Sequence, residues 1–259
     1  MTGWLSCGRA LLPAFAVASS GLLASPVIVD AAPPSAKLDF KLPKNTSLGE
    51  PAIMTARLYN TTGYRIVADF GVSDQTEFVF LHARPDGSKV RVKPSLTPAS
   101  RMRTSHLMLR DTSYTASVVL DQWLDVAQIG RHTLDVEFHG SVQIDGGDPA
   151  GLKRTARLTI DVTPRDPARL EKRGAEWLKQ ISTLSPGADA RTAASALAAM
   201  QDPIAIPYLE LATTRTRSPL FVEALKSMGN AEARGALERL ARSPDQDVRS
   251  LAQKALTGR

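Results

Sequence analysis

The sequence predicts a multidomain β + α protein, with a β-sandwich over residues 36–163 and a short all-α helical repeat over residues 168–258. In the first part, short runs of alternating apolar and polar residues recur between turn signals, as in antiparallel sheets. In the second part this alternation stops, and Ala, Leu, Glu and Arg, which favour helices, become frequent. The second part also resembles itself at an offset of 28 residues (Ala196 to Ala224), which indicates stacked helical units.

The first 31 residues predict a secretory signal peptide. Arg9 is the only basic residue among them, an apolar run follows from Ala10 to Ala24, and the small residues Ala31 and Ala32 suit a cleavage site. The run is interrupted and shorter than the roughly 20 apolar residues of a transmembrane helix. An uncleaved membrane anchor is the alternative. We therefore expect an extracytoplasmic protein, periplasmic or secreted, with no stable membrane span after cleavage.

Charge and cysteine content restrict the classes of function. The formal net charge is +6, and residues 167–259 contribute +4 of it, from 14 basic and 10 acidic residues. The charges are interspersed and form no basic block, whereas nucleic-acid-binding proteins carry a clustered basic footprint. We therefore expect no nucleic-acid partner. The single cysteine, Cys7, lies in the predicted signal peptide, so the mature chain is expected to have no disulfide and no thiol nucleophile.

The first half of the predicted sandwich contains several strand signals in succession. The alternating apolar residues are Leu38, Phe40 and Leu42, then Ala52, Met54, Ala56 and Leu58, then Tyr64, Ile66, Ala68 and Phe70. A turn at 60–63 separates the last two runs and ends in Gly63, which tolerates positive φ. A short apolar run at 78–81 then leads through a Pro-Asp-Gly turn at 85–87 to a strand at 89–92.

The second half of the sandwich continues in the same way. Candidate strands occupy residues 105–109 and 114–120, and a third run at 133–138 has three alternating apolar residues. A Gly-Gly loop at 145–149 precedes the closing strand. The apolar residues of these last two runs are Leu134, Val136 and Phe138, then Ala156, Leu158, Ile160 and Val162. Seven or more short strands in about 130 residues predict two packed sheets.

Certain motifs in this part resemble the immunoglobulin-like modules of bacterial envelope proteins. The motifs are Leu48-Gly49-Glu50-Pro51 before a strand that ends in Asn60-Thr61-Thr62, Trp123-Leu124-Asp125-Val126, and Ile129-Gly130 before a late strand. The part is also similar to proteinase-inhibitor-type immunoglobulin-like domains, although no inhibitory loop is transferable residue by residue. The resemblance implies an immunoglobulin-like β-sandwich that lacks the cysteine pair of antibody domains.

Prolines at 164 and 167 end the strand pattern, so residues 164–167 are predicted to form a linker. One amphipathic helix is expected next, and a Ser-Pro-Gly stop follows it at 185–187. Its apolar face comprises Leu170, Trp177, Leu178, Ile181 and Leu184. The remainder resembles the short HEAT repeats of bacterial proteins at Asp202-Pro203, Ile206-Pro207-Tyr208-Leu209 and Asp247-Val248-Arg249. That resemblance implies a short helical solenoid. Because large aromatic side chains are usually buried, Trp177 is expected as a helix-packing residue and Trp123 as a plug at one end of the sandwich, with a binding role as the alternative.

No catalytic, cofactor-binding or metal-binding residue is predicted. The four histidines, His82, His106, His132 and His139, lack metal-ligand spacing and are expected at the surface or at strand edges. The acidic Gly-Gly loop at 145–148 lacks the full calcium-loop pattern and suits a plain hairpin turn. The sequence contains neither a Gly-x-Ser-x-Gly nucleophile motif nor a Gly-rich phosphate loop.

Arginines recur through the helical part. They are Arg215, Arg217, Arg234, Arg239, Arg242 and Arg249. If several of them share one face of the repeat, they form a cationic surface for an acidic protein partner. The alternative is that they are ordinary surface arginines, because mixed charge is normal on exposed helix faces.

These observations favour a non-enzymatic, extracytoplasmic protein-interaction or scaffold protein whose partner is not specified by the sequence. Both predicted architectures present surfaces to partners. One alternative is a proteinase inhibitor or regulator acting through a sandwich loop at residues 95–103. The other is a glycan-binding module, or an enzyme whose site forms only when residues distant in sequence are brought together in the fold.

Overall fold

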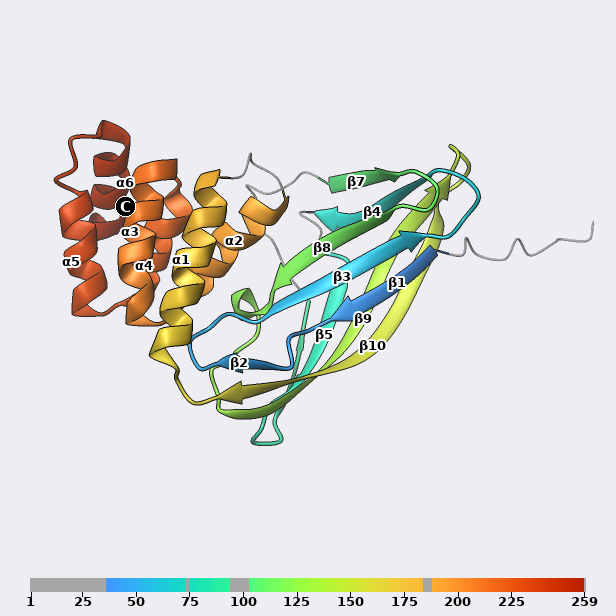
Figure 1. Ribbon diagram of the computed structural model, residues 1–259, viewed down its shortest axis with the longest axis horizontal. Helices are drawn as coiled ribbons and strands as arrows, with labels where there is room; N and C mark the ends of the chain where they lie inside the picture. Colours follow the sequence, from blue (N-terminus) through green and yellow to red (C-terminus); the bar gives the residue numbers. More distant parts are fainter. Residues whose placement is uncertain (1–35, 73–74, 94–102, 184–187, 259) are drawn as a thin grey trace, which may run out of the picture. The chain divides into compact units, whose positions relative to one another are not determined.

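The computed structural model describes residues 36–72, 75–93, 103–183 and 188–258. The predicted signal peptide with Cys7 therefore lies outside the described residues, as does nearly all of the loop at 95–103. The described strands end at Thr163 and the α-helices begin at Pro167, so the chain is a β region followed by a helical region (Figure 1). A mixed β + α fold is thus confirmed.

The β region contains ten described strands. They are β1 (Ala36–Lys41), β2 (Asn45–Ser47), β3 (Ile53–Asn60), β4 (Ile66–Val72), β5 (Phe78–Ala83), β6 (Lys89–Val92), β7 (Arg103–Met108), β8 (Ser113–Val119), β9 (Gly130–Ile144) and β10 (Ala150–Thr163), with a 3-10 turn η1 (Leu120–Gln122) after β8. Strands β1, β3 and β8 form one sheet in that order. The second sheet has the order β2-β10-β9-β4-β7, and β5 joins it through β9 and carries β6.

The two sheets share one apolar core, to which alternate residues of each strand contribute. On β3, Met54, Ala56 and Leu58 are fully buried, as the alternation predicts. Phe70 of β4 and Phe78 of β5 both approach the ring of Phe138 on β9, with ring centroids 5.1 Å apart in each pair. Aromatic rings at this separation and tilt add to the stabilisation that burial gives.

The turn after β3 differs from the prediction at Tyr64. The sequence pattern assigned Tyr64 to the inward face with Ile66, but Tyr64 is 60% exposed whereas Ile66 is buried. The buried amide of Asn60 donates hydrogen bonds to the carbonyl oxygens of Tyr64 (2.8 Å), Met108 (3.3 Å) and Leu109 (2.9 Å). This network holds residues 60–65 as a turn, so β4 begins only at Ile66.

The β9–β10 hairpin is longer than the sequence runs predicted. Its register runs from Gly130 opposite Val162 to Val142 opposite Ala150. The turn between the strands has positive φ at Asp145 (44°) and Gly146 (80°), as a tight hairpin requires. The outward face of the hairpin carries cross-strand ion pairs, such as Arg157 with Asp135. These pairs stabilise the hairpin at the polar positions of its alternating sequence.

The helical region consists of α1 (Pro167–Thr183), α2 (Ala188–Ala199), a 3-10 turn η2 (Pro203–Ala205), α3 (Ile206–Thr216), α4 (Pro219–Met228), α5 (Ala231–Leu240) and α6 (Gln246–Thr257). Helices α1, α3 and α5 contact one another in series, and so do α2, α4 and α6. Side chains that cap helix starts are Asp202 for η2, Ser218 for α4, Asn230 for α5 and Asp245 for α6.

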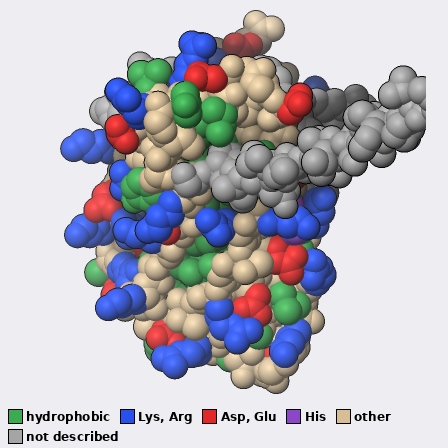
Figure 2. Space-filling view, turned by 90° about the vertical axis from the view of Figure 1, so that its right-hand side faces the viewer, with side chains coloured by type: hydrophobic (Ala, Val, Ile, Leu, Met, Phe, Trp, Pro, Cys, Tyr) green, Lys and Arg blue, Asp and Glu red, His purple; other side chains and the backbone are tan. Residues whose placement is uncertain are grey.

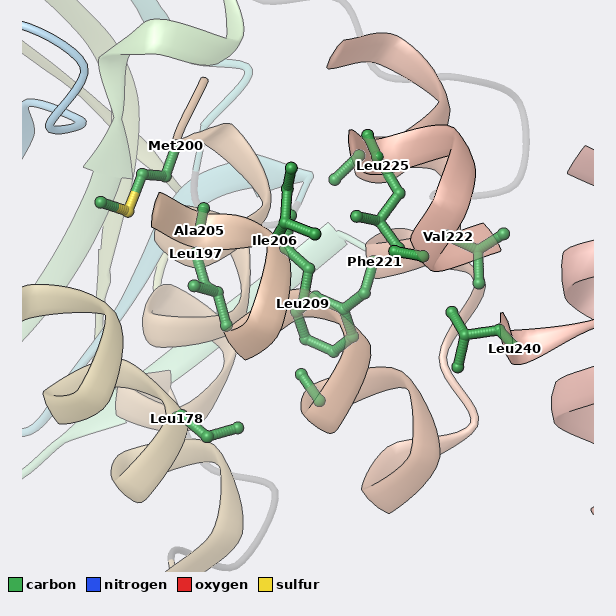
Figure 3. Close-up of a cluster of buried hydrophobic side chains, with 14 of the residues drawn as sticks. Leu178, Leu197, Met200, Ala205, Ile206, Leu209, Phe221, Val222, Leu225 and Leu240 are labelled. Carbon is green, nitrogen blue, oxygen red and sulfur yellow. The ribbon is translucent and has the colours of Figure 1, made fainter. Parts of the chain in front are cut away.

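Ala and Leu dominate the helical core (Figure 3). Ala196 and Leu197 of α2 are buried, as are Ala224 and Leu225, their equivalents in α4 at the offset of 28. Small alanines permit close approach of the helices, and the larger leucines fill the wider gaps. Trp177 of α1 is also buried in this cluster, as predicted.

None of the helices formed by the described residues is long and apolar enough to cross a membrane.

Candidate interaction site

Four of the six predicted arginines lie at one edge of the helical region. Arg215 and Arg217 are at the end of α3, Arg242 follows α5, and Arg249 is in the first turns of α6. The guanidinium of Arg215 donates to Ser182 Oγ at the end of α1 (2.8 Å), so the ends of α1 and α3 meet there. We call Arg215, Arg217, Arg242 and Arg249 the arginine edge.

A contact with Asp245, the residue that caps α6, fixes the position of Arg217 in the arginine edge. Arg217 ends α3 in a left-handed conformation (φ 53°), and its Nε bonds Asp245 Oδ2 at 2.9 Å. Asp245 also caps α6 by accepting from the backbone N–H groups of Asp247 and Val248. The hydrogen bond from Arg217 lowers the pKa of Asp245 below its usual value, so this carboxylate stays ionised.

Arg249 completes the edge by bonding main-chain oxygens. Its Nη1 donates to the carbonyl of Ser243 at 2.6 Å, just after α5 ends. Carbonyl oxygens at a helix C-terminus carry partial negative charge, which favours a cation there. Asp245 and Asp247 are the acidic residues that pair with this edge, so the six charges sum to +2 (four minus two).

The other two predicted arginines lie on α5, away from the arginine edge. Arg234 pairs with Glu238 of the same helix at 3.3 Å. Arg239 forms a two-pronged pair with Glu210 of α3, at 2.9 and 2.7 Å. Glu210 and Arg239 are 29 residues apart in sequence, one more than the repeat offset of 28. Their ion pair therefore joins nearly equivalent positions on α3 and α5.

Charges of both signs are mixed elsewhere on the surface. Figure 2 shows a face on which Lys and Arg side chains are widely spread, with Asp and Glu between them and hydrophobic side chains in small groups. A shallow depression of about 230 Å³ on α1 is lined by Arg169, Lys172, Arg173 and Glu176. Two of these cations are already paired with a buried carboxylate, which leaves the depression little free positive charge.

That carboxylate is Glu50, in the turn before β3. Its side chain is only 4% exposed and lies 2.6 Å from Arg169 Nε and 3.0 Å from Arg173 Nε. It also accepts hydrogen bonds from Thr46 Oγ1 (3.1 Å) and the backbone N–H of Ser47 (3.0 Å). These two ion pairs and the hydrogen bonds from Thr46 and Ser47 compensate the cost of burying the charge.

A second buried carboxylate, Asp202, lies beside the same turn. Gly49 has φ +87°, and a Cβ there would lie 3.2 Å from the Asp202 side chain, so glycine permits the close approach. Arg165 binds Asp202 through both carboxylate oxygens, and that hydrogen bonding lowers the pKa of Asp202. The Gly-Glu-Pro and Asp-Pro motifs, which the sequence singled out separately, therefore adjoin.

Two histidines require a correction to the sequence prediction. His82 and His132 were expected at the surface or at edges, yet they are 1% and 0% exposed. His82 Nε2 lies 2.8 Å from His132 Nδ1, and His132 Nε2 lies 2.6 Å from the carbonyl of Gln128. The two residues belong to neighbouring strands, β5 and β9, that come from distant parts of the sequence, which is why spacing did not reveal the pair.

The hydrogen-bond network assigns the donors in this pair. The Gln128 carbonyl accepts only, so His132 Nε2 donates to it; with neutral rings, His132 Nδ1 accepts from His82 Nε2. Burial, then the charges of His132 and Arg84, lowers the pKa of His82 to about 4. The Nε of Arg84 is buried without a hydrogen-bond partner.

Asp121, near the start of the loop from Leu120 to Ile129, also has a perturbed pKa. Asp121 Oδ2 accepts a 2.6 Å hydrogen bond from the backbone N–H of Ala52. Burial raises the pKa of Asp121 to about 7, against the opposing effect of that hydrogen bond. The loop from Leu120 to Ile129 is thus tied to the β region at Asp121 and again at Gln128. Within the described part of the chain, no group of three or more His, Cys, Asp or Glu residues has a geometry that would hold a metal ion.

Comparisons with known proteins add little. No protein-family model matches the chain, and no curated protein was found to match it. A Bordetella pertussis structure described as ApaA has 10% identity and a TM-score of 0.33, covering 50% of this chain and 95% of that one. A PapD-like domain of human CEP192 has 13% identity and a TM-score of 0.26, covering 60% and 100%. A β-glucosidase from Listeria innocua has 12% identity and a TM-score of 0.29, covering 50% and 16%. Likenesses at this level carry no argument about function.

Proposed function

We propose that the chain is a non-enzymatic scaffold protein that acts outside the cytoplasm and binds an acidic protein segment at the arginine edge. The observation that carries the proposal is the convergence of Arg215, Arg217, Arg242 and Arg249 from the end of α3, the segment after α5 and the first turns of α6. Among the described residues, Arg215 and Arg249 bond uncharged oxygens, so no carboxylate there neutralises their positive charges.

The finer architecture belongs to the same proposal. The β region is an immunoglobulin-like sandwich, and the helical region is a short HEAT-like array. The two sheets around one core and the serial contacts of alternate helices support this assignment. Export is supported only by the apolar, small-residue pattern of residues 1–31.

A charge-matched comparison tests the arginine edge. The probe is a fluorescein-labelled peptide rich in Glu, and its binding is followed by fluorescence anisotropy. The variant Arg215→Glu/Arg242→Glu/Arg249→Glu is compared with Lys44→Glu/Lys153→Glu/Arg154→Glu, which changes the net charge equally at exposed positions of the β region. We expect about a tenfold loss of affinity in the first variant, from two exposed charges and the partly buried Arg249, worth roughly 0.5 kcal/mol each.

The control variant should lose less than about threefold, and added salt should weaken wild-type binding because exposed charges are screened. Equal losses in both variants would show that binding follows net charge alone, and the arginine edge would then be rejected as the site. Peptide binding that persists unchanged in the first variant would reject it as well.

A further inference from the structure

The β region and the helical region share buried apolar side chains where they meet. Val119, the last residue of β8, is 1% exposed and belongs to the hydrophobic cluster of the helices, and Ile53, opposite it on β3, packs against the same cluster. Their neighbours Val118 and Met54 are buried in the core of the β region. Because successive side chains of a strand point to opposite faces, this end of the sheet β1-β3-β8 is covered on both sides.

Two buried carboxylates bind arginines across the same junction. Glu50, in the turn before β3, pairs with Arg169 and Arg173 of α1. Asp202, which caps η2, binds Arg165 through both carboxylate oxygens, and Arg165 lies between β10 and α1. If the two regions moved apart, the apolar contacts and these ion pairs would be lost together.

The segment between β10 and α1 is itself held in place. Ser47 Oγ accepts a hydrogen bond from the backbone N–H of Asp166 at 2.8 Å, and the backbone N–H of Leu48 donates to the carbonyl of Thr163 at 2.9 Å. Both regions belong to one compact unit of the chain. Domains that move independently are instead joined by exposed linkers that few contacts cross.

We propose that the β region is the N-terminal cap of the helical array, so that the two regions unfold as one cooperative unit. Each end of a helical array presents an apolar face, and a terminal unit must cover that face for the array to be stable. Helix α2, in the first pair of helices, contacts β8, and Val119 and Ile53 supply the apolar cover there. The β region thereby takes the place of a capping repeat.

Native-state hydrogen exchange of the full chain, measured by mass spectrometry, tests this coupling with a matched pair of substitutions. Leu134→Ala creates a cavity in the core of the β region, and Leu209→Ala creates one in the helical core; both leucines are fully buried. Such a change lowers the ratio of folded to unfolded protein by roughly thirtyfold or more. Amides that exchange only through global unfolding lose protection by that whole factor.

We expect each substitution to lower the protection of the slowest amides in β9 and in α3 by the same factor. If Leu209→Ala lowers protection in the helices and leaves β9 unchanged, or Leu134→Ala does the reverse, the two regions unfold separately and the proposal is overturned. Neither variant alters the junction, so this comparison decides the matter without a substitution there.

A second pair of variants places the coupling at the junction. Ile53→Asp puts a charge against the helical cluster, whereas Thr115→Asp adds the same charge at an exposed position on the same face of the sheet. With Ile53→Asp, the effect of Leu209→Ala on β9 should fall to within about twofold of none, as for uncoupled sites. With Thr115→Asp it should persist in full. Circular dichroism verifies that both variants are folded, and undiminished transmission in Ile53→Asp would overturn the assignment of this junction as the cap.

Discussion

The β region and the helical region differ in where they bury polar groups. In the β region the buried polar residues are Thr46, Ser47, Glu50, Asn60, Thr62, His82 and His132. Among the described residues of the helical region they are Asp202 and Thr213, and Thr213 bonds the carbonyl of Leu209 one turn earlier in its own helix. In the β region, Asn60, Glu50 and the His82–His132 pair instead bond partners 48 or more residues away, so its stability should respond more strongly to single substitutions at these positions.

The largest effect is expected at Glu50. Glu50→Ala removes the buried carboxylate that pairs with Arg169 and Arg173, although Arg173 keeps Glu176, and removes the acceptor for Thr46 Oγ1 and Ser47 N–H. We expect a loss of about 3 kcal/mol in the free energy of unfolding, measured by urea denaturation, because the buried Thr46 hydroxyl and Ser47 N–H lose hydrogen bonds to a charged acceptor. The matched control is Glu176→Ala, which removes the exposed partner of Arg173 and should have a much smaller effect. Similar losses in the two variants would contradict the role assigned to Glu50.

The next effect is a pH dependence at His82. Its pKa is lowered from 6.5 to about 4 in the folded chain, so the unfolded chain binds the proton first on acidification. Wild type should therefore lose roughly 3 kcal/mol relative to His82→Gln as the pH falls from 6.5 to 4. Urea denaturation of both proteins at several pH values measures the difference. A His82→Gln curve parallel to wild type would refute the prediction.

The smallest effect is expected in the helical region. Arg239→Ala removes the pair with Glu210 that joins α5 to α3, but the arginine side chain is 59% exposed. Exposed pairs contribute about 0.2–1 kcal/mol, so thermal unfolding should shift by only a few degrees. A loss as large as that of Glu50→Ala would remove the contrast between the two regions.

Sequence patterns predicted the apolar framework of both regions because it depends on local period. Alternation placed Met54 and Leu58 inward on β3, and Leu134 and Phe138 on β9, and all four are buried. The pattern failed at Tyr64, because the side chain of Asn60 ends the turn with bonds to residues 48 and 49 positions away.

The polar contacts were not predictable in the same way. His82 and His132 are 50 residues apart, and Glu50 and Arg173 are 123 apart, so no local period brings them together. In the helical region, charge pairs follow the spacing of the repeat. Arg217 and Asp245 are separated by 28 residues and Arg239 and Glu210 by 29, close to the internal offset, so a search for opposite charges at that spacing would have found both pairs.

Two buried groups associated with the loop from Leu120 to Ile129 affect the pH dependence of stability in opposite directions: Asp121 within it, and His82, which is linked to it through His132 and Gln128. The folded-state pKa of His82 lies below its unfolded value of 6.5, so its contribution to stability grows as the pH rises from about 4 to 6.5. The folded-state pKa of Asp121, about 7, lies above its unfolded value of 3.8, so its contribution shrinks as the pH rises over nearly the same range. Each changes by about 1.4 kcal/mol per pH unit, with opposite sign. Between about pH 4 and 6.5 the two contributions therefore oppose each other, so the pH dependence of stability that the pair produces is smaller than that of either group alone.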